Sequence, residues 1–377
     1  MFIRSTQVDI ERSLFQDKIV ILYGARQVGK TTVVKNIQSK FKDSRYLNCD
    51  EGFVRQNLNR LENSKDLKEF FGDSKLIILD EAQRVDNIGL KLKLMIDNYP
   101  ETQILVTGSS SLELGKEINE PLTGRKIIFN LYPLASNELG LSKFELKNIS
   151  FLEKALVFGL YPEIYSQTDQ SKAKDKLDLL VESYLYKDIL ELVEIRNSKQ
   201  ILDRLLQLLA FQIGNEVSFT SLANDLNINQ ETVQKYIELL EDAFIIFRLP
   251  AFSRNLRQEV FKTRKIYFYD LGVRNSLIKN FNPLSLRDDL GSLWENFMII
   301  ERLKQNKYKR VLANMYFWRN YAQAEIDYIE EKDGILNCFE FKWNDRKKAK
   351  LPDSFKEAYP NHTFKVINGE NWLELLG

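Results

Sequence analysis

The stretch KIVILYGARQVGKTT, residues 18–32, joins a short apolar run to a glycine-rich turn. Ile19–Tyr23 is rich in β-branched residues, which predicts a buried strand, and a helical pattern follows the turn. The turn from Gly24 to Thr31 fits the pattern G-x-x-x-x-G-K-[ST]. In that pattern backbone N–H groups and a helix N-terminus surround a phosphate. A chance match on a strand-to-helix turn is the alternative, but the strand before the turn and the helix after it favour a phosphate-binding loop.

The loop predicts ATP and Mg²⁺ as cofactors. Its lysine is expected to reach the β- and γ-phosphates, and its first threonine hydroxyl is expected to bind Mg²⁺. The residues expected to contact the nucleotide are Gly24, Ala25, Arg26, Gln27, Val28, Gly29, Lys30, Thr31 and Thr32.

A second apolar run, Leu76–Leu79, ends in two acidic residues, Asp80 and Glu81. A parallel strand delivers such carboxylates to the sheet edge where ligands bind. This is the Walker B arrangement, in which Asp80 holds Mg²⁺ and Glu81 accepts a proton from the attacking water. An acidic cap on the following helix is the alternative. Next to a phosphate-binding loop, the pair favours hydrolysis.

Two further residues are candidates for the same site. Ser109 follows the strand Gln103–Val106 and is a candidate sensor of the γ-phosphate, with a plain turn or helix cap as the alternative. Arg125 is a candidate arginine finger, acting in cis or on a neighbouring subunit, with a solvated surface arginine as the alternative.

The alternation of strands and helices up to about residue 130 predicts an α/β fold with a parallel sheet flanked by helices. We expect this domain to span residues 1–145 and a helical lid or spacer to span 146–209. A helix, a turn, a helix and a strand within 210–252 predict a winged helix. A last α/β domain, with strand candidates MYFWRNYAQAEIDYI and ILNCFEFKW, is expected at 253–377.

Composition limits the classes of partner. The 377 residues carry 54 Lys and Arg against 53 Asp and Glu, a net charge of +1, so any nucleic-acid contact must come from a local patch. No apolar run reaches the roughly 18–20 residues of a membrane span, and no signal peptide is evident. Two cysteines far apart fit a reduced compartment. We therefore expect a cytoplasmic protein that has no membrane contact.

Several segments resemble prokaryotic AAA-superfamily ATPases, related to the archaeal ATPase clade, that carry a C-terminal restriction-endonuclease-like domain. The resemblance extends from the loop to the last strands, and implies that architecture for residues 1–145 and 253–377. The segments that carry it are YGARQVGKTT, LIILDEAQR, ILVTGSSS, LTGRKIIFNLYPLASNEL, YLYKDIL, the winged-helix segment, WENF, EIDYI and FEFK.

The C-terminal domain contains a candidate metal and nuclease site. Glu340 and Lys342 alternate with apolar residues on one strand, and a hairpin brings Asp327 within reach. Two carboxylates and a lysine suit Mg²⁺-dependent phosphodiester cleavage, in which Lys342 positions or activates water. The resemblance implies the same assignment, with Glu295 as a further metal ligand. An exposed hairpin with a Glu340–Lys342 charge pair is the alternative.

Charge separates the two candidate nucleic-acid surfaces. The segment from Asn215 to Pro250 contains six acidic and two basic residues. This negative net charge opposes DNA binding and favours packing or a protein contact. The segment from Arg254 to Lys265 contains five basic residues and one acidic residue. This basic segment could contact phosphates or be a solvated charged run.

The sequence therefore predicts a Mg²⁺-dependent ATPase whose nucleotide state controls a nuclease-like, DNA-binding C-terminal domain. The alternative is an ATP-dependent switch that regulates assembly or binds protein partners through a catalytically inert nuclease-like domain. Self-association is compatible with both hypotheses.

Overall fold

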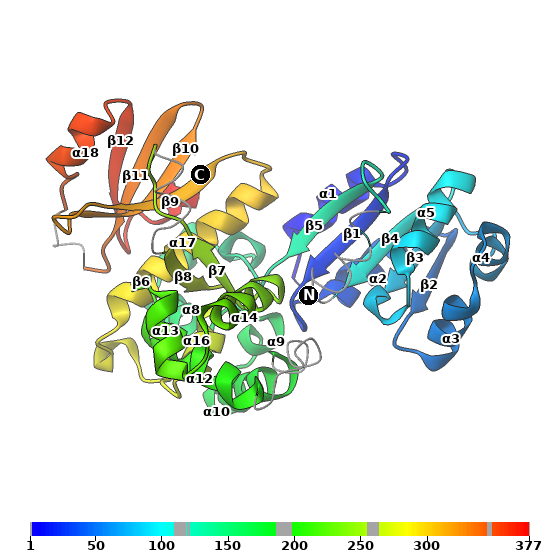
Figure 1. Ribbon diagram of the computed structural model, residues 1–377, viewed down its shortest axis with the longest axis horizontal. Helices are drawn as coiled ribbons and strands as arrows, with labels where there is room; N and C mark the ends of the chain where they lie inside the picture. The colour runs from blue at the N-terminus through cyan, green and yellow to red at the C-terminus, as the bar shows by residue number, and fades with distance from the viewer. Residues whose placement is uncertain are drawn as a thin grey trace. The chain divides into compact units, whose positions relative to one another are not determined.

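The computed structural model describes residues 2–108, 118, 121–185, 198–254, 264–344 and 349–376 (Figure 1). Two compact units are present. The first is Met1–Leu134 with Asp242–Phe244, and the second is Ala135–Glu241 with Ile245–Gly377. The first division falls after Leu134, whereas the sequence suggested residue 145.

The first unit contains the predicted parallel sheet. Its strands are β1 (Ile19–Gly24), β2 (Ser44–Asn48), β3 (Leu76–Asp80), β4 (Gln103–Gly108) and β5 (Lys126–Leu131), in the order β2-β3-β4-β1-β5. All four neighbouring pairs are parallel. The residues of β1, β3 and β4 are buried throughout, as expected where helices cover both faces of a sheet.

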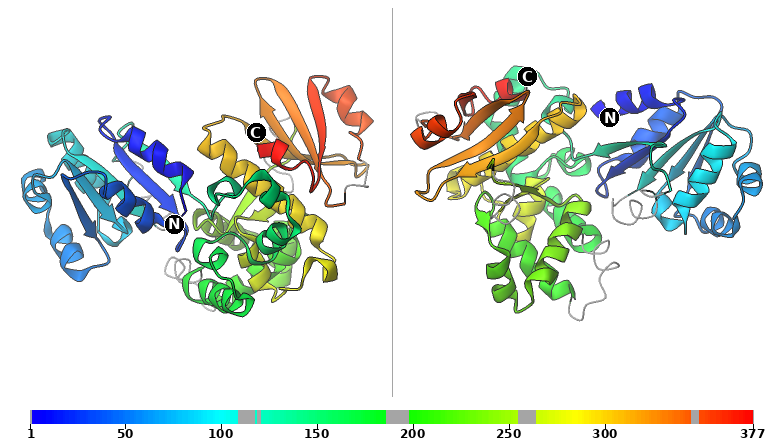
Figure 2. Two further views of the ribbon diagram at one scale, coloured as in Figure 1. Left: turned by 180° about the vertical axis from the view of Figure 1, so that it is seen from behind. Right: turned by 45° about the horizontal axis from the view of Figure 1, so that its top comes forward.

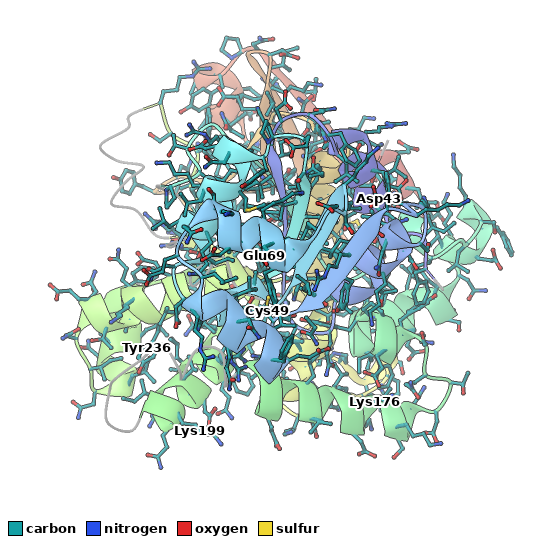
Figure 3. The ribbon with its side chains drawn as sticks, turned by 90° about the vertical axis from the view of Figure 1, so that its right-hand side faces the viewer. Asp43, Cys49, Glu69, Lys176, Lys199 and Tyr236 are labelled. Atoms are coloured by element: carbon teal, nitrogen blue, oxygen red, sulfur yellow. The ribbon has the colours of Figure 1, made fainter. Side chains whose placement is uncertain are left out.

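One helix precedes these strands and others connect them (Figure 2). They are α1 (Ser5–Ser13), α2 (Lys30–Gln38), α3 (Gly52–Arg60), α4 (Ser64–Phe71), the 3₁₀ turn η1 (Ala82–Arg84) and α5 (Ile88–Asn98). In Figure 3 the unit is seen from the side of β2, with Asp43 just before this strand and Cys49 just after it. The α/β fold predicted for this part of the chain is confirmed.

The second unit begins with short helices. These are η2 (Ser136–Glu138), α7 (Lys143–Lys147), α8 (Ile149–Phe158), α9 (Pro162–Tyr165), α10 (Gln170–Leu179), the π-helix η3 (Leu180–Leu185) and α12 (Ser198–Phe211). Ser142 and Glu145 form a capping box at α7, and Asp169 caps α10. The helical character expected from the amphipathic pattern is present over the described residues.

A small antiparallel sheet follows, with strands β6 (Glu216–Val217), β7 (Ile246–Leu249) and β8 (Arg264–Phe268) in the order β6-β8-β7. Helices α13 (Phe219–Leu226) and α14 (Gln230–Asp242) lie between β6 and β7 in the chain. The helix, turn, helix and strand occur in the predicted order. The sheet crosses the predicted boundary after residue 252, because β8 lies beyond it and pairs with both other strands.

The last part of the chain forms a four-stranded sheet with the order β12-β11-β10-β9. Its strands are β9 (Asn314–Arg319), β10 (Glu325–Lys332), β11 (Ile335–Phe341) and β12 (His362–Ile367). The accompanying helices are α16 (Leu271–Leu277), η4 (Leu284–Leu286), α17 (Leu290–Tyr308), α18 (Asp353–Ala358) and α19 (Leu373–Leu376). Helix α17 contacts both β11 and β8.

One strand prediction in this domain needs correction. MYFWRNYAQAEIDYI contains two antiparallel strands, β9 and β10, rather than one. The chain turns between them, where the Asn320 amide donates a hydrogen bond to the Ala324 carbonyl at 3.0 Å. Gln323 has a φ of 64°, which lies in the left-handed region used by tight turns. Among the described helices, none combines the length and the apolar character needed to cross a membrane.

Candidate functional site

The predicted phosphate-binding loop joins β1 to α2, and the structure explains why glycine is needed at both of its glycine positions. A Cβ atom on Gly24 would lie 2.4 Å from the carbonyl oxygen of Leu131. Gly29, which precedes α2, has a φ of 100°, in the region that favours glycine. The backbone of the loop therefore needs the small residues that the sequence pattern contains.

The side chain of Lys30 is held inside the loop. It is 5% exposed, and its Nζ donates hydrogen bonds to the carbonyl oxygens of Gly24 at 3.0 Å and Ala25 at 3.1 Å. A carboxylate oxygen of Glu81 lies 3.8 Å from the same Nζ. The loop lysine and the acidic end of β3 are thus adjacent, as the sequence predicted.

Asp80 is buried and accepts hydrogen bonds from three hydroxyl groups. The Thr31 hydroxyl donates to Oδ2 at 2.7 Å and the Tyr46 hydroxyl donates to the same oxygen at 2.6 Å. The Thr107 hydroxyl donates to Oδ1. Burial raises the pKa of Tyr46, and the hydrogen bond to Asp80 and its charge raise it further, so Tyr46 remains a donor. These hydroxyls stabilise a carboxylate that burial alone would disfavour.

Glu81 is held in an uncommon backbone conformation. Its φ is 55°, which is unusual for a residue with a side chain, and its backbone N–H donates to the Thr107 hydroxyl at 3.0 Å. Gln83 donates to the Glu81 carboxylate at 2.7 Å. The side chain is 22% exposed and can therefore contact water. Local strain of this kind is often found at functional sites.

The structure does not bring Arg125 to this site. Arg125 comes directly before β5, whose first residue Lys126 pairs with Ile19 at the start of β1, whereas the loop follows the end of β1. Six strand residues at roughly 3.3 Å each separate the two ends. The Arg125 Nε instead lies 2.8 Å from Asp97 Oδ1. The expected role in cis does not fit this position, and a role on a neighbouring subunit stays a prediction.

Ser109, the candidate sensor, lies outside the described residues. Of the remaining loop positions, Gln27 and Thr32 are exposed and Arg26 is partly buried. Tyr46 and Thr107, which contact Asp80, were not predicted from the sequence. Thr107 was detectable, since it lies two residues before Ser109 at the end of the same predicted strand. Tyr46 had no comparable signal, because its hydrogen bond to Asp80 depends on the pairing of β2 with β3, in which Tyr46 lies opposite Ile78, two residues before Asp80.

The second candidate site lies in the C-terminal sheet. Lys342 Nζ is 2.7 Å from Glu340 Oε2 and 3.4 Å from Asp327 Oδ2, and Asp327 also accepts a hydrogen bond from the Phe341 amide at 2.8 Å. The register of β10 against β9 shifts between Ile326 and Ile329, a span that includes Asp327 and indicates a local bulge or irregularity in β10. Bulges of this kind occur next to active sites, where they redirect side chains. The three predicted residues are therefore brought together.

Burial and charge perturb this cluster. Burial, followed by the charge of Asp327, raises the pKa of Glu340 to about 7. Burial lowers the pKa of Lys342, but Asp327 and Glu340 outweigh it, and the net shift is upward. The lysine is thus kept positively charged by its two acidic neighbours.

Glu295, on α17, is bound differently from the prediction. Its carboxylate accepts hydrogen bonds from Lys265 at 3.0 Å and from the Tyr267 hydroxyl at 2.5 Å. Burial raises the pKa of Glu295 to about 7, while Lys265 lowers it and Asp327 raises it further. Among the described residues, no group of three or more His, Cys, Asp or Glu side chains is arranged to hold a metal ion. In this structure Glu295 is paired with Lys265 and Tyr267, and its role as a further metal ligand stays a prediction.

The same contacts correct the predicted basic surface. Lys265 is 1% exposed and pairs with Glu295 and Glu325, so it does not belong to a surface that contacts phosphates. Residues 255–263 of that segment, which include Arg257 and Lys262, lie outside the described residues.

Comparisons with known proteins divide the chain in a similar way. A model described as an AAA domain matches residues 16–140. Two models described as domains of unknown function, DUF8612 and DUF4143, match residues 149–284 and 290–375. The AAA match supports the ATPase part of the resemblance, whereas the restriction-endonuclease-like assignment stays a prediction.

Individual relatives extend over most of the chain. It is 30% identical to the uncharacterized protein MJ1544 of Methanocaldococcus jannaschii over 382 aligned positions, which cover 96% of this chain and 83% of that protein. It is 27% identical to the uncharacterized protein Rv2008c of Mycobacterium tuberculosis, covering 90% and 73% of the two chains. A solved structure, the Walker-type ATPase PABY2304 of Pyrococcus abyssi, covers 73% of this chain and 94% of its own. The TM-score of this comparison is 0.44, at 18% sequence identity.

The first match extends over 96% of this chain in one alignment, at 30% identity. This chain belongs to the same family as MJ1544 of Methanocaldococcus jannaschii, and its N-terminal domain is an AAA-type P-loop ATPase domain.

Proposed function

We propose that the N-terminal domain hydrolyses ATP with Mg²⁺ bound next to Thr31 and Asp80. The observation that carries this proposal is the 2.7 Å hydrogen bond between the two side chains, beside the loop lysine. A hydroxyl next to a carboxylate at the end of a phosphate-binding loop is the donor set that a hard divalent cation prefers. The residues present are therefore suited to binding Mg²⁺ and a nucleoside triphosphate.

Each residue has a separate role in this proposal. Lys30 exchanges its hydrogen bonds to the loop carbonyls for contacts to the β- and γ-phosphates. Glu81, exposed to water and positioned by Thr107, orients the attacking water and accepts its proton. When bound, Mg²⁺ neutralises charge on the phosphates. Binding and turnover should therefore be separable by mutation.

Two variants test the proposal against one control. Lys30→Ala should weaken nucleotide binding, because the phosphates lose their counter-charge, whereas Glu81→Gln should bind nucleotide and stop turnover. Lys18→Ala, an exposed lysine before β1 at the opposite end of that strand, is the matched control. Fluorescence titration with ADP and steady-state phosphate release measure both effects. Nucleotide binding by Lys30→Ala equal to that of Lys18→Ala, or full turnover by Glu81→Gln, would contradict the proposal.

A specific observation favours a second activity, the binding and cleavage of nucleic-acid phosphodiesters at Asp327, Glu340 and Lys342. Lys342 contacts both carboxylates, and Asp327 lies in the part of β10 where the register against β9 shifts. Two carboxylates are enough for Mg²⁺ when substrate phosphate and water supply the other ligands, so this pair fits the metal without Glu295. Lys342 would be released from the carboxylates by the metal and would orient water or the phosphate.

Cleavage assays on single- and double-stranded DNA and RNA, with Mg²⁺ or Mn²⁺, test this activity. Asp327→Ala and Lys342→Ala should abolish cleavage and leave ATP hydrolysis intact. Lys332→Ala, an exposed lysine at the end of β10, is the matched control. If ATP hydrolysis controls this site, Lys30→Ala should also change the cleavage rate. A wild-type protein that neither cleaves nor binds divalent ions at Asp327 would instead support the ATP-dependent switch that binds protein partners.

A further inference from the structure

Arg4 lies far from the loop motif in the sequence but contacts the loop directly. Its Nη1 donates a hydrogen bond to the carbonyl oxygen of Val28 at 2.6 Å, and its Nη2 donates to the carbonyl oxygen of Tyr132 at 2.6 Å. The side chain is only 4% exposed. One guanidinium group therefore joins the loop to the residue that follows β5.

The first of these contacts fixes the orientation of one peptide unit. The carbonyl of Val28 and the N–H of Gly29 belong to the same planar peptide, in which they point in opposite directions. Because Arg4 holds the carbonyl, the N–H of Gly29 points away from Arg4. Gly29 has a φ of 100° and could otherwise reach several backbone conformations.

The second contact holds Arg4 itself in place. Tyr132 directly follows β5, which is paired with β1 along its whole length. A planar guanidinium group can donate to two carbonyls at a fixed angle, which a lysine ammonium does not reproduce. The sheet thus supports Arg4, and Arg4 supports the loop.

We propose that Arg4 is a positioning residue that keeps the Val28–Gly29 peptide in the orientation that binds nucleotide phosphate. This inference rests on the proposed ATPase function and adds a residue outside the loop motif. Without Arg4 the loop would populate other peptide orientations, and the apparent dissociation constant would rise in inverse proportion to the competent fraction. Once nucleotide is bound, the competent orientation is selected, and Thr31, Asp80 and Glu81 act as before.

The test compares Arg4→Ala, Arg4→Lys and the matched control Arg12→Ala, an exposed arginine on α1. The loss of a charged hydrogen bond should raise the ADP dissociation constant and the KM for ATP about tenfold or more in Arg4→Ala. The kcat at saturating ATP should stay within about threefold of wild type. Arg4→Lys should restore part of the affinity, and Arg12→Ala should match wild type.

The outcomes separate positioning from a purely structural role. Loss of folded protein would lower kcat per total protein and leave KM unchanged, and this result would overturn the proposal. ADP affinity of Arg4→Ala equal to that of Arg12→Ala would also overturn it. If Arg4→Ala does not fold, Arg4→Lys decides, because a wild-type KM in that variant refutes the need for the two-carbonyl contact. A wild-type protein that binds no nucleotide would refute the proposed function, and this inference with it.

Discussion

Replacing Thr107 by valine should slow ATP hydrolysis while the nucleotide still binds. Valine has nearly the same shape but lacks the hydroxyl that donates to Asp80 and accepts from the Glu81 amide at 3.0 Å. Thr107 is fully buried, so water does not readily replace the hydroxyl, and the Glu81 N–H loses its partner. An unpaired buried group costs about 1–3 kcal/mol. If the loss of this hydrogen bond displaces Glu81 and raises the activation free energy by the same amount, kcat falls about 5- to 150-fold.

Thr107→Ser is the matched control, because serine keeps the hydroxyl. Steady-state phosphate release at saturating ATP measures kcat, and ADP titration shows whether the loop still binds nucleotide. We expect Thr107→Ser to retain most of the turnover that Thr107→Val loses. Equal kcat in the two variants would show that the hydroxyl does not position Glu81, and the reasoning from the Asp80 hydrogen bonds would be refuted.

Three further predictions concern stability and assembly. Tyr46→Phe should destabilise the first unit by about 1.5–3 kcal/mol in thermal denaturation, whereas Tyr23→Phe should not, since no partner of the Tyr23 hydroxyl is found in the described structure. Arg302→Met should destabilise the second unit by about 3–5 kcal/mol, because Glu330 is buried against it at 2.6 and 2.7 Å. Burial raises the pKa of Glu330, but hydrogen bonds from Arg302 and its other partners outweigh burial and lower the pKa. In urea denaturation, Arg302→Met should therefore be less stable than wild type at pH values above the ordinary glutamate pKa. This difference in stability should disappear as the pH falls through the lowered pKa of Glu330. Arg125→Ala should lower turnover per chain at high protein concentration and leave ADP affinity within about threefold, if the residue acts across subunits; turnover equal to wild type at all concentrations would assign it to the surface.

Much of the first domain was predictable, because its signals are local. Each central strand is a short apolar run that ends in polar residues, and a parallel sheet brings those ends to one edge. Lys30, Thr31, Asp80 and Glu81 were therefore predicted in one site, and the structure places them together. The hairpin that unites Asp327, Glu340 and Lys342 was predictable from strand alternation for the same reason.

The missed features depend on pairings between distant residues. Arg125 could be excluded from the cis site only once β5 was known to run parallel to β1. Strand β8 was expected in the C-terminal domain but pairs with β6 and β7, a pairing that the 14-residue connection of residues 250–263 does not indicate. Arg4 has no motif at all, since its partners are the backbone carbonyls of Val28 and Tyr132. Every residue has a backbone carbonyl, so the residue types at positions 28 and 132 do not indicate that Arg4 binds there.

The two candidate sites differ in how they hold their buried carboxylates, and this difference affects how each would bind a cation. Asp80 accepts its three hydrogen bonds from hydroxyls, which are neutral and can rotate toward another acceptor. Glu340 and Asp327 are held by Lys342, a positive charge that a metal ion would have to displace. A divalent cation therefore meets less opposition at the first site than at the second. In the second site, the negative charge of a substrate phosphate offers Lys342 a new partner, so metal and phosphate are expected to enter together.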